Sequence, residues 1–257
     1  MNIMFRRIFY SVLLILLFSN PNTIIAESIT IAVASNFAET ARHLIQEFEE
    51  NSGHEVSLIL GSSGRFFAQI SNGAPFDIFL SADREKPATL VAVGLALSES
   101  RFTYAIGRVA LWSEDENLIS GDASVLSTDK YKKIAFANPR LAPYGKAAME
   151  VLTALSLSDD LRGRLVQGEN IAQTYQFVFT RNAELGFVAL AQIMKNDVLT
   201  SGSAWLVPEN LHLPIRQDAV LLAKSKKNIA AHAFMDFLKA PEGRKIIQSY
   251  GYRVEGL

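Results

Sequence analysis

The stretch ITIAVASNFAETARHLIQEFEE, residues 29–50, contains the pattern that decides the fold: an apolar strand, a short polar turn and an amphipathic helix. Residues 29–33 predict a buried strand, and from residue 36 onward apolar side chains recur on one helical face. Between them, the turn Ser35-Asn36 lies at a helix start, where N–H groups are unpaired and the helix dipole is positive. A turn of this kind can hold an anion without Lys or Arg.

The same arrangement recurs along the chain. Ser62-Ser63-Gly64 follows a strand expected at residues 55–60, and both Pro143-Tyr144-Gly145 and Asn170-Ile171 stand at expected helix starts. Ile171 is apolar, so only its N–H group can reach a ligand. Hydroxyl and N–H groups are uncharged donors, whereas a fully ionised oxyanion offers only acceptors. Together the turns predict several helix starts directed at one small oxyanion.

Each of these residues also has a plain structural interpretation, which the sequence leaves open. Ser35 and Ser63 fit as helix caps, and Asn36 with Glu39 three residues later has the spacing of a capping box. Tyr144 fits as an aromatic residue of the core. The prediction of an anion site therefore rests on the turns taken jointly.

Strands and helices alternate along most of the chain, which predicts an α/β fold with mostly parallel sheets flanked by helices. An extended segment at residues 101–112, with Gly107 inside it, predicts a crossing between two lobes. The two C-terminal helices are expected to return to the first lobe, with hinges near Gly107 and Val220. The predicted parts are a signal peptide at residues 1–26, a first lobe of residues 27–107 and 221–257, and a second lobe of residues 108–220.

The first 26 residues have the composition of a secretory signal. Arg6 and Arg7 form a basic start, and Ile8–Phe18 is an apolar run too short to span a bilayer comfortably. Ala26 offers a small residue for cleavage, and a membrane anchor is the weaker alternative. The sequence has no Cys, which argues against a lipoprotein and a disulfide scaffold. We therefore expect export to the periplasm of a two-membrane bacterium.

Composition and motifs argue against nucleic-acid binding and against catalysis. The formal net charge is −1, so no basic face for a nucleic acid is indicated. The four His residues lack metal-ligand spacing, and no HExxH, GxSxG, GxGxxG or phosphate-loop motif is present. Asp77 and Asp83 fit a strand end and a helix cap better than a catalytic pair. We expect no enzyme, no catalytic residue and no cofactor, with a secreted hydrolase that uses Ser63 as nucleophile as the alternative.

The stretch GAPFDIFLSAD, residues 73–83, closely resembles a hallmark of the periplasmic molybdate-binding proteins of ABC transporters. The resemblance extends through nearly all of the chain after residue 26. It also includes AVASNF at 32–37, GSSG at 61–64, NP at 138–139, PYG at 143–145, GENI at 168–171, NAELGFVAL at 182–190 and FLKAPEG at 237–243.

This resemblance implies a two-lobed periplasmic-binding-protein fold of the venus-flytrap type, with the anion held between the lobes. Carried over by position, Ser35, Asn36 and Ser63 would bind the oxyanion from the first lobe. Tyr144 and Ile171 would bind it from the second lobe, mainly through their N–H groups. The molybdenum would be held only through its oxygen atoms, without a direct bond between protein and metal.

The sequence departs from the family pattern at one position of the site. Ala189 stands where some members place a Tyr whose hydroxyl reaches the anion, so we expect that contact to be missing. Asn36 and Tyr144 match an alternative pattern within the family, in which Asn36 is the candidate for the replacement hydrogen bond.

The resemblance further implies a monomeric carrier that captures molybdate, and also tungstate, and delivers it to an inner-membrane ABC permease. The same fold binding sulfate or phosphate is an alternative, and Glu169 is near enough to one turn to accept the proton of a phosphate. A ligand-free signalling or scaffold module is a further alternative.

Overall fold

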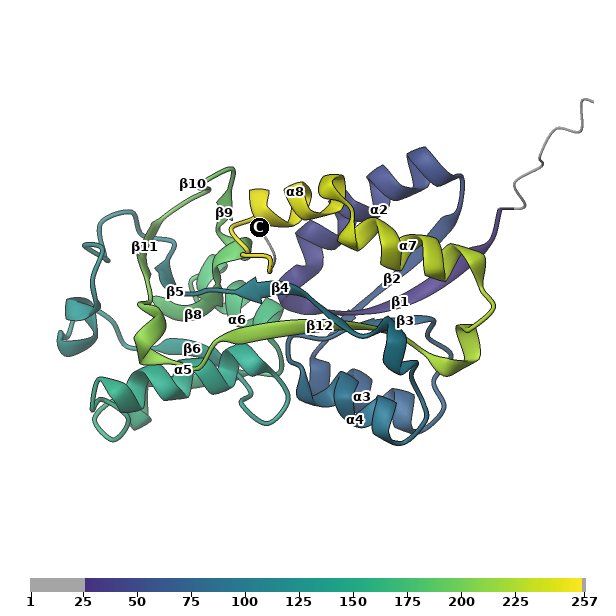
Figure 1. The fold of residues 1–257 in the computed structure, drawn as a ribbon. Coiled ribbons are helices and arrows are strands. Elements are labelled where there is room, and N and C mark those ends of the chain that lie inside the picture. Colours follow the sequence, from purple (N-terminus) through teal and green to yellow (C-terminus); the bar gives the residue numbers. More distant parts are fainter. Residues whose placement is uncertain (1–25, 256–257) are drawn as a thin grey trace, which may run out of the picture.

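The computed structural model describes residues 26–255 of the 257-residue chain. The predicted signal peptide, residues 1–26, therefore lies outside the described residues except for Ala26. Among the described residues, no helix is both long and apolar enough to cross a membrane. The described chain forms two lobes side by side, each built on its own β-sheet (Figure 1).

The sheet of the first lobe begins with three parallel strands at one edge. The fourth strand runs antiparallel to both of its neighbours, the third and the fifth. In order across the sheet, the strands are β2 (Glu55–Gly61), β1 (Ser28–Ala34), β3 (Ile78–Leu80), β12 (Ile215–Leu221) and β4 (Phe102–Gly107). The apolar strand predicted at residues 29–33 is thus β1, which pairs with β2 on one side and β3 on the other.

Helices cover both faces of this first sheet, as the β-α-β pattern predicts. One face carries α2 (Ala38–Ser52), α7 (Ile229–Lys239) and α8 (Pro241–Ser249), and the other carries α3 (Ser63–Ser71) and α4 (Glu85–Ala92). Because successive strand residues face opposite sides, Ile31 and Val33 pack in the core under α2 and α7, whereas Ala32 packs in the core under α3 and α4. The C-terminal helices return to the first lobe, as expected.

The second lobe repeats the plan with five strands of mixed direction. In order they are β11 (Ser203–Leu206), β5 (Val109–Ser113), β8 (Leu185–Ala189), β6 (Ile134–Ala137) and β7 (Leu165–Gly168). The helix α5 (Pro143–Ala154) packs against one face of this sheet and α6 (Ile171–Phe179) against the other. The predicted fold class, two α/β lobes of the periplasmic-binding-protein type, is confirmed.

The chain crosses between the lobes at two extended segments. The first crossing leads from β4, which ends at Gly107, to β5, which begins at Val109. The second leads from β11 to β12, and β12 already belongs to the first sheet from Ile215 onward. The predicted lobe limits remain a prediction, and this strand order favours a second crossing before Ile215 rather than near Val220.

Three strands are absent from the sequence prediction. They are β11 and the two-residue strands β9 (Met194–Lys195) and β10 (Val198–Leu199), which pair as a small hairpin. The two-residue strands β9 and β10 carry too few residues for an alternating pattern to be recognised. The sequence also predicts an apolar strand at residues 219–223, and the corresponding strand β12 begins four residues earlier, at Ile215. The remaining predicted elements match the observed ones within a few residues.

Candidate functional site

The four polar turns singled out in the sequence meet at one place between the lobes. Ser35 and Asn36 form the short helix η1 (Ser35–Phe37) at the end of β1, and Ser63 is the first residue of α3. Tyr144 lies in the first turn of α5, and Ile171 is the first residue of α6. Together they border a small cavity of about 10 Å³, which is also lined by Ala34, Gly61, Ser62, Ala82, Ala142 and Pro143.

On the first-lobe side, the serines reach this cavity from helix starts. Ser62 is the N-cap of α3, and its hydroxyl oxygen accepts a hydrogen bond from the Arg65 amide at 3.4 Å. Ser63 is buried, and its Oγ accepts a hydrogen bond from the Ala82 amide at 2.9 Å. A hydroxyl that accepts through its oxygen still has its own hydrogen to donate. Ser63 can therefore donate to an acceptor in the cavity while the Ala82 amide holds it in place.

Asn36 does not cap a helix, so the capping-box interpretation of Asn36 and Glu39 is wrong. The N-cap position of α2 is Phe37, and no side chain caps that helix. Instead Asn36 Nδ2 donates to Gln217 Oε1 at 2.8 Å and to the Tyr252 hydroxyl at 3.0 Å. An amide nitrogen has two hydrogens, and both are used within the protein. The Asn36 side chain therefore has no donor left for an anion, and its backbone N–H is the group that a ligand can use.

The second-lobe side of the cavity is formed by two helix starts. Ala142 is the N-cap residue of α5, followed by Pro143, whose fixed φ suits a first helical position. Asn170 caps α6, with its Oδ1 accepting a hydrogen bond from the Gln173 amide at 3.0 Å. The amides of Tyr144 and Ile171 lie in first helical turns, where backbone N–H groups have no intrahelical acceptor.

Gln192 is a supporting residue that sequence reasoning missed. Its Nε2 donates to the Ile171 carbonyl at 3.1 Å, and its Oε1 accepts from the Ala189 amide at 3.0 Å. The Gln192 side chain thereby ties the start of α6 to the end of β8. Ala189 is buried in β8 and is not among the residues that line the cavity.

The residues that line the cavity carry no charged side chain, so the site is made of neutral donors and helix-start dipoles. It also lacks a carboxylate that could accept the proton of a phosphate. Glu169, which the sequence left open for that role, instead forms an ion pair with Arg65 at 3.1 Å. This pair joins the start of α6 to α3 and therefore spans the two lobes.

A second contact between the lobes lies beside the cavity. The Gly64 amide in α3 donates to the Leu141 carbonyl at 2.9 Å, and Leu141 belongs to the loop before α5. A Cβ atom at residue 64 would lie 2.9 Å from Leu141 Cα. The approach of the two lobes at this point therefore requires glycine.

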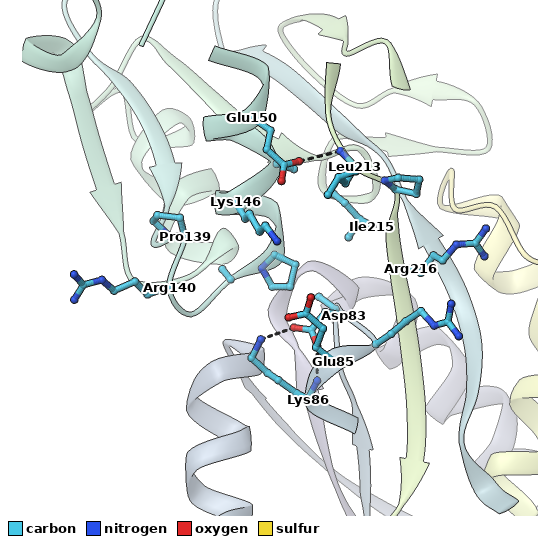
Figure 2. Close-up of a pocket in the computed structure, with 16 residues that line it drawn as sticks. Asp83, Glu85, Lys86, Pro139, Arg140, Lys146, Glu150, Leu213, Ile215 and Arg216 are labelled. Carbon is cyan, nitrogen blue, oxygen red and sulfur yellow. Dashed lines mark hydrogen bonds and ion pairs between the residues drawn. The ribbon is translucent and has the colours of Figure 1, made fainter. Parts of the chain in front are cut away.

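A larger groove of about 330 Å³ adjoins the cavity and also lies between the lobes (Figure 2). It shares Ala82, Ala142 and Pro143 with the cavity, but its rim is charged. In Figure 2, Lys146 of α5 points into this groove from the second lobe, opposite the Asp83–Lys86 ion pair of the first. The groove thus differs from the cavity, whose lining is neutral.

Asp77, Asp83 and Ser63 each accept a hydrogen bond from a backbone amide. Asp83 Oδ1 accepts a hydrogen bond from the Lys86 amide at 2.9 Å, as a helix-start residue does, and Asp77 Oδ2 accepts one from the Thr30 amide at 2.6 Å. Among residues 26–255, no group of three or more His, Cys, Asp or Glu side chains could hold a metal ion. Ser63 has the Ala82 amide as its hydrogen-bond partner rather than a general base.

Comparison with known proteins agrees with this fold. Residues 29–253 match the family described as bacterial extracellular solute-binding protein, and the chain belongs to that family. It is 46% identical over 230 residues to the molybdate-binding protein ModA of Azotobacter vinelandii, covering 90% of this chain and 91% of the relative. It is also 45% identical over 230 residues to the Rhodobacter capsulatus ModA, covering 90% of each protein.

A solved structure is similar as well. The periplasmic molybdate-binding protein of Azotobacter vinelandii superposes with a TM-score of 0.86 at 40% identity, covering 89% of this chain and all of that one. The similarity therefore extends over both lobes and over the crossings between them.

Proposed function

We propose that this protein captures molybdate in the periplasm for an ABC importer. The observation that carries the proposal is the convergence of four helix starts, two from each lobe, on one cavity with a neutral lining. The proteins named molybdate-binding at 45% and 46% identity over nine tenths of the chain support the choice of oxyanion.

In the proposed complex, the oxyanion accepts hydrogen bonds from the Ser35 and Ser63 side chains and from main-chain N–H groups. The backbone amides of Asn36, Tyr144 and Ile171 complete the set. Each hydrogen bond to a charged group contributes about 1.5–3 kcal/mol. About five to seven of them offset the loss of water from a dianion and leave a binding free energy on the order of −8 kcal/mol, which is a micromolar Kd.

The chemistry of the donors also supports a selectivity. A site without a carboxylate disfavours a protonated phosphate, because the phosphate proton would have no acceptor. Sulfate is a smaller oxyanion, so donors placed for molybdate would be out of its reach. Tungstate forms an oxyanion of nearly the same size as molybdate, and we include it among the ligands.

The proposal extends to the setting in which the protein works. It is exported by its N-terminal signal peptide, binds as a monomer and passes the anion to an inner-membrane permease. It is a carrier rather than an enzyme, and it has no cofactor beside its ligand. Closure of the lobes is coupled to anion binding, because only the closed arrangement brings donors from both lobes to the anion.

The test is the melting temperature of the mature protein with molybdate, tungstate, sulfate and phosphate at equal concentrations. A ligand at 100 times its Kd adds about 2.7 kcal/mol to the free energy of unfolding, which is about 5–10 °C in Tm for a chain of this length. We expect that shift with molybdate and tungstate only. An equal shift with sulfate or phosphate contradicts the proposed selectivity, and no shift with any oxyanion contradicts the function.

A pair of serine variants tests the site itself. Ser63→Ala removes a hydroxyl from the cavity, and Ser113→Ala is the matched control, because Ser113 is also buried and also accepts one backbone amide, from Asp115 at 3.1 Å. We expect Ser63→Ala to weaken molybdate binding about 10-fold or more, the loss of one charged hydrogen bond. Equal affinities of the two variants would remove Ser63 from the site.

A further inference from the structure

A buried polar cluster lies directly behind the anion cavity. At its centre is Gln217 of β12, which is fully buried. Gln217 Oε1 accepts hydrogen bonds from Asn36 Nδ2 at 2.8 Å and from the Tyr104 hydroxyl at 3.1 Å. Gln217 Nε2 donates to the Tyr144 hydroxyl at 3.3 Å, and the Tyr252 hydroxyl donates to the Asn36 carbonyl at 2.8 Å. The cluster thus contacts two of the proposed ligand-binding residues, Asn36 and Tyr144.

The cluster joins the two lobes. Asn36, Tyr104 and Gln217 belong to elements of the first lobe, whereas Tyr144 belongs to α5 of the second. The contacts of Tyr144 with Gln217 and with Tyr252, which packs in the core of the first lobe, therefore depend on how the lobes are placed. The hydrogen bonds among Asn36, Tyr104, Gln217 and Tyr252 lie within the first lobe and do not require closure.

The hydroxyl of Tyr144 lies between the two chain segments that lead from lobe to lobe. A Cβ atom at Gly107, in the first crossing, would lie 2.1 Å from the Tyr144 hydroxyl and 2.7 Å from Gln217 Nε2. A β-bulge between Gln217 and Asp218 marks the strand that leaves the second crossing. Rotation of one lobe about these crossings therefore changes the position of the Tyr144 hydroxyl relative to Gln217.

The cluster is electrically neutral. Burial raises the pKa of the Tyr144, Tyr104 and Tyr252 hydroxyls, so all three remain protonated at physiological pH. Neutral buried hydrogen bonds are directional, and an unpaired member is costly. A small displacement of Tyr144 therefore leaves Gln217 Nε2 without that partner and disfavours intermediate lobe positions.

We propose that Gln217 is a positioning residue that couples anion binding to the angle between the lobes. It holds the Tyr144 side chain at the crossings and the Asn36 side chain at the first-lobe turn. This inference rests on the proposed function. Through one side chain, Gln217 fixes a residue of each lobe whose backbone amide is proposed to bind the anion. Binding of the anion and formation of the Gln217–Tyr144 bond then favour the same closed arrangement.

The test uses Tyr144→Phe, which removes the hydroxyl but leaves the backbone amide in place. Tyr131→Phe is the matched control, because Tyr131 is a buried tyrosine of the second lobe whose hydroxyl donates to the Leu126 carbonyl at 2.7 Å. By titration calorimetry with molybdate, we expect Tyr144→Phe to raise Kd about twofold to tenfold, the loss of one neutral hydrogen bond. Stopped-flow measurements should show that this rise in Kd comes from faster dissociation of molybdate. Tyr131→Phe lowers Tm without changing Kd.

A double-mutant cycle with Gln217→Met assigns the effect to the pair. If the two residues act together, Tyr144→Phe has no further effect on Kd in the Gln217→Met background. Additive effects of the two substitutions on Kd overturn the inference. A wild-type Kd for Tyr144→Phe also overturns it, and this single variant decides the question if Gln217→Met does not fold. Wild-type protein that fails to bind molybdate refutes the proposed function and the coupling with it, whereas normal wild-type binding with an unaltered Tyr144→Phe refutes the coupling alone.

Discussion

Replacing Gly64 with alanine separates the stability of the free protein from its ability to close on a ligand. Gly64 is the second residue of α3, and its backbone does not have a positive φ, so alanine fits the helix itself. In an exposed helix interior, this exchange stabilises by up to about 1 kcal/mol. In this structure, however, the added Cβ would lie 2.9 Å from Leu141 Cα and 3.0 Å from Leu141 Cδ2.

The free-energy cost of Gly64→Ala follows from its contact with the Leu141 backbone, which cannot move aside by a rotamer change as the end of a side chain can. The lobes must separate by a few tenths of an ångström, which also weakens the bond of 2.9 Å between the Gly64 amide and the Leu141 carbonyl. Overpacking of this kind costs about 1–3 kcal/mol. If that cost falls on the closed state alone, Kd for molybdate rises about 5-fold to 150-fold.

Titration calorimetry and thermal unfolding measure the two effects on the same samples. We expect Gly64→Ala to keep or raise the Tm of the ligand-free protein while it weakens binding. The control is Gly163→Ala, because a Cβ at Gly163 would meet no atom within 4 Å. Wild-type affinity for Gly64→Ala would refute the claim that the contact between Gly64 and Leu141 belongs to the ligand-binding arrangement.

Three further predictions concern other contacts. Gly107→Ala should lower both the affinity and the Tm, measured as above, because its Cβ would collide with the Tyr144 hydroxyl at 2.1 Å; an unchanged Tm contradicts this. Arg65→Gln should raise Kd less than about fivefold, with the effect vanishing at high salt, because its partner Glu169 is exposed; a larger, salt-independent loss contradicts this. Burial alone would raise the pKa of Asp77, but its hydrogen bonds lower it below the usual 3.8. Asp77 should therefore stabilise the fold above that pH and lose this contribution as the pH falls through the lowered pKa, so Asp77→Asn should flatten the acid limb of a Tm–pH curve.

Local sequence signals predicted the framework of this site well. The strand at residues 29–33 and the turn Ser35-Asn36 lie in the structure where the pattern placed them. The same holds for the helix starts at Ser63, Pro143 and Ile171. Apolar periodicity and helix-start residues act over a few positions, so one sequence is enough to recognise them.

Contacts between distant parts of the chain could not be predicted in this way. The partners of the Asn36 side chain, Gln217 and Tyr252, lie 181 and 216 residues further along the sequence. Asn36 therefore fits a local cap by its spacing, although the fold uses its amide in a buried cluster. Gln217 lies between Arg216 and Asp218 in the polar first half of β12, so no apolar run marked it as part of a strand, and the strand predicted at residues 219–223 began two residues after it.

The need for glycine at residue 64 could not be predicted from the sequence either. By its sequence Gly64 is a flexible residue in a serine-rich turn, but glycine is required there because the Leu141 backbone of the other lobe lies so close. Such a requirement appears only when the two lobes are placed against each other. The same holds for Arg65, whose partner Glu169 lies across the cleft.

The central claim is that uncharged donors from both lobes enclose one oxyanion. A crystal structure of the protein with molybdate, with anomalous data collected at the molybdenum edge, tests it most directly. We predict one strong anomalous peak in the cavity bordered by Ser35, Ser63, Tyr144 and Ile171, with oxygen atoms within hydrogen-bond distance of donors from both lobes. A peak in the charged groove beside Lys146 instead, or contacts from one lobe only, would contradict it.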